Sequence, residues 1–349
     1  MPPFRVALIG YGLAGSAFHA PFITTTPELA LAAIVTRDEA RRELARSRHP
    51  EAELLDSADE LWQRAGDFDL VVVGAPARAH VPLATAAVEA GLPVVVEKPF
   101  APTVAEGRAL VETARERGVL LTVFQNRRWD GDFLTVRRLI EQGELGEIMR
   151  FESSFERWRP DVDPDSYAES DPVVGGVVFD LGSHLVDQAL QLFGRARSVY
   201  GEVDSRRPGS RSDDDAFVAL THESGVRSHL WMSAAATQAA PRFRVLGMRA
   251  GYLKYGLDVQ EDALRAGELP GGPEWGREPE DAWGVVGAGD DVRPVPTEPG
   301  AYQDFYRGLV ASLSDGAPPP ADPQDAVDGL EVLEAARLSA VEGRVVARS

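Results

Sequence analysis

Residues 4–15 read FRVALIGYGLAG, and this stretch predicts the fold of the first part of the chain. Phe4–Ile9 is a short apolar run of the kind that forms a buried parallel strand. Three glycines follow at the spacing G-x-G-x-x-G, namely Gly10, Gly12 and Gly15. The first permits a tight turn, the second lets the backbone approach a pyrophosphate, and the third lets the next helix pack against the strand. The stretch therefore favours a dinucleotide-binding turn over a purely architectural one.

Composition limits the classes of protein to which the chain can belong. It has 349 residues, of which 44% are hydrophobic, a formal net charge of −19 and no cysteine. That length predicts two domains, and the absence of cysteine excludes disulfides and thiolate metal sites. The negative charge argues against a nucleic-acid partner or an anionic membrane, although local amides and arginines still permit an anionic cofactor. Without a signal peptide or an apolar run of about 20 residues, we expect a cytoplasmic protein with no membrane partner.

The first third of the chain alternates strands with helices. Strand-like apolar runs lie at Leu29–Val35, Leu70–Val73, Pro93–Val96 and Val119–Phe124, with helical segments between them. This alternation is typical of a doubly wound parallel sheet. We therefore expect a dinucleotide-binding Rossmann domain, an α/β fold, over residues 1–124.

The pattern changes after Asn126. Apolar residues alternate over Met149–Phe155, and a helix is predicted over Val178–Phe193, ending at Gly194. The strand-like runs that follow are joined by turns rather than helical crossovers, and they lie at Ser198–Val203, Ala216–Thr221, Arg227–Met232 and Arg242–Gly247. This arrangement indicates an α+β domain with an open, mostly antiparallel sheet over residues 125–349.

The end of the second predicted strand bears on the choice of cofactor. Rossmann domains that bind NAD usually place an acid there, but this chain has Thr36 and Arg37. A hydroxyl and a guanidinium suit the 2′-phosphate of NADP, and Arg41 lies one helical turn further on. Asp38 keeps NAD open, and the arginines are also compatible with a solvated helix start. We favour NADP. The other expected cofactor-binding residues flank the strand ends, and they are Gly10, Gly12, Leu13, Ala14, Gly15, Ala75, Pro76, His80, Glu97 and Lys98.

Lys98 is a candidate catalytic residue. It lies in the sequence Glu97-Lys98-Pro99, directly after the strand predicted at Pro93–Val96. In open α/β sheets ligands bind beyond the carboxyl ends of the strands. The positive charge of a lysine placed there would stabilise a developing alkoxide. The alternative is an exposed lysine in a proline turn.

Asp180 and His184 form a second candidate catalytic group. Four residues apart on a predicted helix, they lie on one face of it. A carboxylate at that spacing orients an imidazole for general acid/base catalysis. The alternatives are an ordinary contact on a helix surface and half of a metal site. Asp187 extends the polar face without completing a metal motif, so we expect no metal.

Polar residues also gather at the expected junction of the domains. Asn126, Arg127 and Trp129 follow the last predicted strand of the first domain. Such groups suit a polyol substrate, and a hinge of exposed charges is the alternative.

The glycine turn, Glu97-Lys98-Pro99 and Asp180-x-x-x-His184 resemble, in order and spacing, the Gfo/Idh/MocA oxidoreductases. Residues 10–22, 126–130 and 255–267 resemble more narrowly the NADP-dependent scyllo-inositol dehydrogenase branch of that family. The chain departs from the family pattern at one place, where it has Ala75-Pro76-Ala77 and the family has Thr-Pro-Asn. Without the asparagine, one polar contact to the cofactor is lost.

The resemblance implies a dehydrogenase or reductase acting on CH–OH groups, with hydride exchanged between a nicotinamide and a cyclitol or sugar carbon. It implies that Lys98, Asp180 and His184 are catalytic, and that they bind the substrate together with the polar residues at the junction. It further implies a homodimer or homotetramer formed through the C-terminal sheet. Two alternatives remain open, namely an enzyme for another sugar ketone or aldose, and a dinucleotide-sensing regulator without catalysis.

Overall fold

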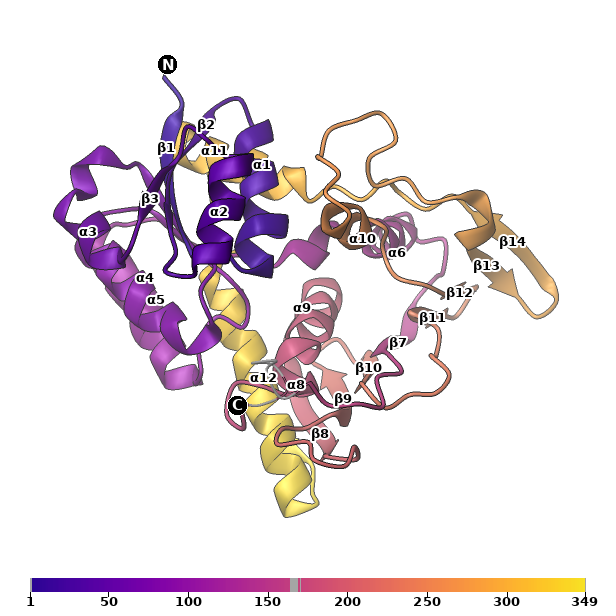
Figure 1. Cartoon of the computed structure of the whole chain (residues 1–349). Helices are drawn as coiled ribbons and strands as arrows, with labels where there is room; N and C mark the ends of the chain where they lie inside the picture. The colour runs from indigo at the N-terminus through magenta and orange to yellow at the C-terminus, as the bar shows by residue number, and fades with distance from the viewer. Residues whose placement is uncertain (1, 164–168, 170, 349) are drawn as a thin grey trace. The chain divides into compact units, whose positions relative to one another are not determined.

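The structure is a computed structural model that describes residues 2–163, 169 and 171–348 (Figure 1). Contacts within the chain divide it into two compact units, each built from three segments. The first unit contains Met1–Asn126, Gln260–Trp275 and Ala301–Val327, and the second contains Arg127–Val259, Gly276–Gly300 and Asp328–Ser349. The single division at residue 124 that the sequence suggests stays a prediction.

The first unit contains a six-stranded parallel sheet with the strand order β3-β2-β1-β4-β5-β6. This is the order of a doubly wound dinucleotide-binding sheet, so the predicted fold of this part is confirmed. The strands are β1 (Phe4–Ile9), β2 (Leu29–Val35), β3 (Glu53–Leu55), β4 (Leu70–Val73), β5 (Val94–Val96) and β6 (Leu121–Val123). The helices of this unit are η1 (Ala14–His19), α1 (Ala20–Thr25), α2 (Glu39–Arg48), α3 (Ala58–Gln63), η2 (Ala65–Asp67), η3 (Ala77–Ala79), α4 (His80–Glu89), α5 (Val104–Arg117), α10 (Gln260–Arg265) and α11 (Gln303–Asp315).

Local sequence signals set the ends of these helices. The side chain of Asp38 accepts a hydrogen bond from the backbone N–H of Arg41 at 2.9 Å and so caps α2. Thr103 caps α5 in the same way, and Gly118 ends that helix with a φ of +63°. The strands at the centre of the sheet are apolar and fully buried, as β4 illustrates.

The second unit contains a nine-stranded sheet with the order β14-β13-β12-β11-β7-β10-β9-β8-β15. Every neighbouring pair is antiparallel except β7 and β10, so the predicted mostly antiparallel sheet is confirmed. The strands are β7 (Ile148–Glu156), β8 (Ala196–Asp204), β9 (Asp215–His222), β10 (Arg227–Ser233), β11 (Phe243–Gly247), β12 (Gly251–Lys254), β13 (Gly284–Ala288), β14 (Asp291–Val295) and β15 (Val346–Ala347). The helices here are η4 (Asn126–Trp129) and α12 (Pro323–Glu342), which each begin in the first unit, α6 (Gly131–Glu141), α8 (Val177–Asp180), α9 (Gly182–Phe193) and η5 (Glu280–Ala282).

The predicted helix over Val178–Phe193 is wrong in one respect, because the structure divides it into α8 and α9 at Leu181. The division lies where Gly182 packs closely against neighbouring side chains. A β-carbon built on Gly182 would lie 2.9 Å from Sδ of Met232 and 3.2 Å from Cδ2 of Leu333. Glycine is also a poor residue for a helix interior. Close packing therefore explains why position 182 holds a glycine, and this glycine weakens the helix where it is interrupted.

Candidate functional site

The glycine turn after β1 shows why two of its three glycines are required. Gly10 has a φ of +94°, and a β-carbon on it would lie 2.6 Å from the carbonyl oxygen of Gly74. A β-carbon on Gly15 would lie 2.0 Å from the carbonyl oxygen of Gly10. These two positions admit no side chain. The space beside Gly12 is different, because a β-carbon there would meet only the guanidinium of Arg41, with Nη1 3.7 Å away. An open backbone beside a cation fits the phosphates of a dinucleotide.

The helical segment that begins after Gly12 starts as the wide turn η1 and continues as α1. Leu13 and Ala14 lie at its beginning, and the side chain of Leu13 is half exposed. The N–H groups of a first helical turn lack partners within the helix and can bind an anion. The role of both residues in cofactor binding stays a prediction.

The end of β2 places Thr36 and Arg37 in different surroundings. Thr36 is buried, and its N–H donates to the carbonyl oxygen of Leu55. Arg37 is exposed, and its Nε donates to the carbonyl oxygen of Asp56 at 3.0 Å. The carboxylate that follows, Asp38, caps α2. One exposed guanidinium and a capping acid therefore stand where NAD-binding domains usually present an acid to the ribose.

The turn after β5 holds a buried carboxylate next to Lys98. Oε2 of Glu97 accepts a hydrogen bond from the N–H of Lys98 at 2.8 Å, and Oε1 lies 3.1 Å from Nε2 of His19. Burial raises the pKa of Glu97, but the contact with His19 and the positive charge of Lys98 outweigh it and hold that pKa below its usual value. Lys98 itself is partly exposed.

His80 joins this turn to the loop that follows β4. Its Nδ1 lies 2.8 Å from the carbonyl oxygen of Pro99, and its Nε2 lies 2.8 Å from the carbonyl oxygen of Ala75. The ring is 1% exposed, and burial lowers the pKa of His80. One ring nitrogen therefore faces the backbone directly after Lys98, and the other faces the loop after β4. A direct contact of Ala75, Pro76 or His80 with a cofactor stays a prediction.

Asp180 and His184 lie in neighbouring helices of the second unit. Asp180 ends α8, is partly exposed and lines a small cavity of about 60 Å³ together with residues that include Arg157 and Arg207. His184 lies in the first turn of α9 and is 4% exposed. The interpretation of this pair as a contact on a helix surface is therefore wrong for the histidine. Burying an imidazole in the first turn of a helix limits its motion, which suits a general acid or base.

Asn126, Arg127 and Trp129 form the short helix η4, at which the chain passes from the first unit to the second. Arg127 is 6% exposed, with Nη1 3.3 Å from Oδ2 of Asp130 and its guanidinium over the ring of Phe155. The interpretation of this segment as a hinge of exposed charges is therefore wrong. Substrate binding by these three residues stays a prediction.

Comparison with known proteins identifies the family. Residues 4–125 match the profile of an oxidoreductase family with an NAD-binding Rossmann fold, and residues 133–253 match the profile of the Gfo/Idh/MocA C-terminal domain. The chain belongs to the Gfo/Idh/MocA family of oxidoreductases. The predicted resemblance, the oxidoreductase class and the nicotinamide dinucleotide cofactor are thereby confirmed.

Members of this family resemble the chain over nearly its whole length. It is 34% identical to scyllo-inositol 2-dehydrogenase (NADP(+)) IolW of Bacillus subtilis, covering 98% of this chain and 95% of that protein. It is 38% identical to the oxidoreductase YdgJ of Escherichia coli, and the match covers 95% of this chain and 94% of that protein. The solved structure of the oxidoreductase yvaA from Bacillus subtilis superposes with a TM-score of 0.94 at 33% identity, covering 100% of this chain and 99% of that one.

The structure places the guanidinium of Arg41, which the sequence associates with Arg37, beside Gly12, 29 positions away along the chain. Two other side chains near the site of this family member, His19 and Tyr306, have no clear signal in the sequence. His19 and Tyr306 meet at 2.6 Å across 287 positions. A weak signal exists for His19, because a histidine four residues after the glycine motif lies in a helix that must pack on the sheet. No pattern identifies Tyr306.

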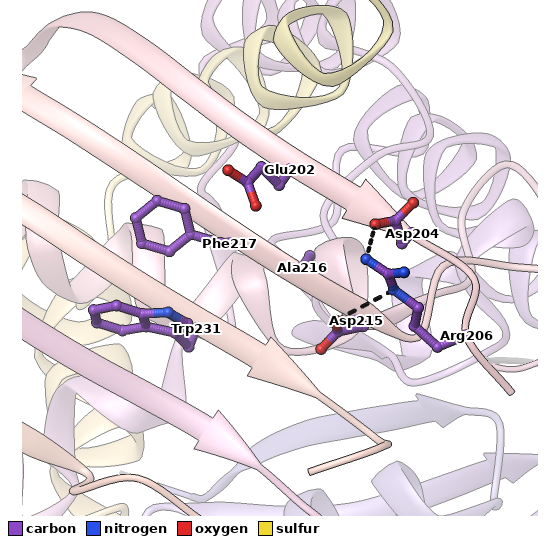
Figure 2. A pocket seen from close by; sticks show the side chains of 7 residues that line it. All are labelled: Glu202, Asp204, Arg206, Asp215, Ala216, Phe217 and Trp231. Atoms are coloured by element: carbon purple, nitrogen blue, oxygen red, sulfur yellow. Dashed lines mark hydrogen bonds and ion pairs between the residues drawn. The ribbon is translucent and has the colours of Figure 1, made fainter. Parts of the chain in front are cut away.

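The second unit also has a concave region on its sheet, with a volume of about 270 Å³. Figure 2 shows the rings of Phe217 and Trp231 close together on neighbouring strands, with Arg206 between Asp204 and Asp215 at the other end. Alternation along β9 and β10 turns these aromatic rings away from the buried side of the sheet. No motif in the sequence marks these residues.

Neither a metal site nor a membrane-spanning helix is found among the residues that the structure describes. In the part of the chain that the structure describes, no group of three or more histidine and acidic side chains has the arrangement of a metal site. Among the helices described, none is both long and apolar enough to cross a bilayer.

Proposed function

We propose that this oxidoreductase uses NADP to interconvert a cyclitol and its ketone, with scyllo-inositol and the corresponding inosose as the pair of substrates. The main support is the relative IolW, whose name states both the substrate and the cofactor and which is 34% identical over 98% of this chain. The substrate is therefore a small polyol or sugar. A cytoplasmic location remains a prediction.

The proposed catalytic group consists of Lys98, Asp180 and His184. In the oxidation direction His184 accepts the hydroxyl proton, and Asp180 keeps the imidazole in its orientation. The ammonium of Lys98 stabilises the negative charge that develops on the substrate oxygen. A bound nicotinamide supplies the hydride acceptor. The proposal requires that the lysine of the first unit and the histidine of the second act on one substrate C–O bond.

The proposed preference for NADP rests on the two arginines that follow β2. Arg37 is exposed at the end of the strand, and Arg41 reaches the open side of Gly12. Asp38, the acid that would favour NAD, accepts a hydrogen bond as a helix cap. These residues, with the three glycines, Leu13, Ala14 and Thr36, would hold the dinucleotide.

We further propose that the protein forms a homodimer or homotetramer through the sheet of the second unit. The aromatic rings of Phe217 and Trp231 lie on the side of the sheet opposite the buried core, and acidic side chains and Arg206 border them (Figure 2). An apolar centre with a polar border is the usual composition of a protein interface. Sedimentation equilibrium of the wild type and of Trp231→Glu tests this assignment, and a monomeric wild type contradicts it.

The experiment that tests the enzymatic function is a panel of inositols and aldoses assayed with NADP and with NAD, in which reduction of the nicotinamide is followed by its absorbance. We expect the highest kcat/KM with scyllo-inositol and NADP. If another polyol or aldose is turned over instead, that compound becomes the assigned substrate and the enzyme family stays the same. Tight NADPH binding without turnover of any compound in the panel supports a dinucleotide-sensing regulator and overturns the enzymatic proposal.

A further inference from the structure

We propose that His19, Glu97 and Tyr306 are positioning residues, which form a buried relay that fixes the backbone of Lys98 for catalysis. The proposal rests on the proposed function of Lys98 and assigns roles to two residues, His19 and Tyr306, outside the expected site. All three belong to the first unit, and they come from η1, from the turn after β5 and from α11.

The contacts form a continuous chain of polar atoms. The hydroxyl of Tyr306 lies 2.6 Å from Nδ1 of His19. Nε2 of His19 lies 3.1 Å from Oε1 of Glu97, and Oε2 of the same carboxylate accepts the N–H of Lys98 at 2.8 Å. The relay therefore starts in α11 and ends on the backbone of the proposed catalytic lysine.

The direction of each hydrogen follows from the chemistry of the groups. A carboxylate only accepts, so the N–H of the His19 ring faces Glu97 from Nε2. When the imidazole is neutral, its other nitrogen accepts and receives the hydroxyl hydrogen of Tyr306. Burial raises the pKa of Tyr306 well above its usual value, with the negative charge of Glu97 adding to the effect, so this phenol keeps its hydrogen.

Burying these groups has an energetic cost that packing alone does not explain. His19 and Tyr306 are fully buried and Glu97 is 7% exposed, and their neighbours include the rings of Phe22 and Phe124. Removing a carboxylate from water costs several kcal/mol, and well-packed apolar side chains of similar volume are often at least as stable. The arrangement therefore serves a purpose other than stability. The chain of contacts from Tyr306 through His19 and Glu97 ends at the N–H of Lys98, which is the group that it holds in place.

A second contact holds the other side of the lysine. The ring of His80 lies between the carbonyl oxygens of Pro99 and Ala75, 2.8 Å from each. The backbone on both sides of Lys98 is thus tied to buried side chains. Such support holds a side chain within the narrow range of positions that catalysis requires, and a displacement of about 1 Å can cost roughly a hundredfold in rate.

The decisive variant is Tyr306→Phe, which removes one oxygen atom from the relay and keeps the ring. We expect kcat on the substrate found in the panel to fall by about tenfold, with the KM values for substrate and NADP within about twofold of the wild type. Tyr302→Phe is the matched control, since Tyr302 is a buried tyrosine of the same region that also packs against Phe22. We expect this control to keep kcat within about twofold.

Variants of Glu97 separate the relay from general packing. Glu97→Ala removes the acceptor of the Lys98 N–H and should lower kcat more than Glu97→Gln, whose amide oxygen can still accept that hydrogen. If Glu97→Ala fails to fold, Tyr306→Phe decides alone. The proposal is overturned if a folded Tyr306→Phe keeps kcat within about twofold, if only its KM changes, or if Tyr302→Phe loses as much activity.

Amide exchange of the peptide that contains Lys98 provides a readout that needs no substrate. Because Glu97 accepts the N–H of Lys98, the relay predicts slow exchange in the wild type and exchange at least about tenfold faster in Tyr306→Phe. If the wild type reduces no cofactor with any polyol, the proposed function fails, and exchange still tests the relay. Unchanged exchange in the variant then contradicts the relay.

Discussion

Arg128 and Asp187 form a bidentate ion pair in the interior of the second unit. Nε and Nη2 of the arginine donate to the two carboxylate oxygens at 2.8 and 2.6 Å. Both side chains are less than a tenth exposed. Asp187 follows His184 by three residues on α9, so the pair ties the helix that carries the proposed base to the segment after β6.

Removing one partner of this pair should be costly. Because Asp187→Ala leaves a buried guanidinium without its main counter-charge, we expect the free energy of unfolding to fall by about 3–5 kcal/mol. The exposed pair of Arg206 with Asp204 is the control, and Asp204→Ala should cost less than about 1 kcal/mol. Urea denaturation measures both variants. A similar small loss for the two would contradict an anchoring role for Asp187.

The proposed chemistry predicts large losses of turnover without loss of cofactor binding. Lys98→Ala and His184→Ala should each lower kcat by about 10²–10⁴-fold, since each removes a group that acts on the reacting C–O bond. Fluorescence titration should give nearly unchanged NADPH affinity. His229→Ala, at a half-buried histidine of β10, is the control for the second variant. Near-normal turnover in either catalytic variant removes that residue from the mechanism.

The proposed preference for NADP predicts a selective effect of Arg37. Loss of a charge-assisted hydrogen bond to the 2′-phosphate should weaken NADPH binding by roughly tenfold or more in Arg37→Ala, while NADH binding changes little. Arg115→Ala, at an exposed arginine of α5, serves as the control. Calorimetric titration with both dinucleotides measures the difference. Equal losses for NADPH and NADH refute the assignment of Thr36 and Arg37 to the 2′-phosphate.

His222 predicts how stability depends on pH. Its Nδ1 lies 2.8 Å from the carbonyl oxygen of Gly194 and its Nε2 lies 2.8 Å from the hydroxyl of Ser228, and burial lowers its pKa in the folded protein. The unfolded chain, with a pKa of about 6.5, then binds more protons. The contribution of this histidine is therefore complete above about pH 6.5 and is lost as the pH falls toward the folded-state pKa.

Urea denaturation at about pH 7.5 and about pH 5.5 measures this dependence. We expect the wild type to lose more stability between these two values than His222→Gln does. The comparison with the variant isolates the histidine from Asp130, whose raised pKa makes stability change in the opposite sense. An identical pH dependence in the two proteins would show that the neutral ring of His222 is not favoured by folding.

The sequence alone determined the features that depend on neighbours along the chain. Continuous apolar runs in the first unit and alternating apolar residues in the second specify strands, and the capping residues Asp38 and Thr103 specify helix starts. The spacing of Gly10, Gly12 and Gly15 specifies the turn after β1. These signals are local, because each acts within one or two turns of backbone. Fold class and family were therefore predictable from them.

Only the tertiary structure decided which distant side chains meet. Arg128 pairs with Asp187 across 59 positions and His19 meets Tyr306 across 287, and no local pattern relates such residues. The need for a glycine at position 182 likewise comes from Met232 and Leu333, which belong to distant elements and leave no room for a β-carbon there. The physical reason is that a buried polar group must find its partner wherever the folded chain places one, and that place is set by packing rather than by sequence spacing.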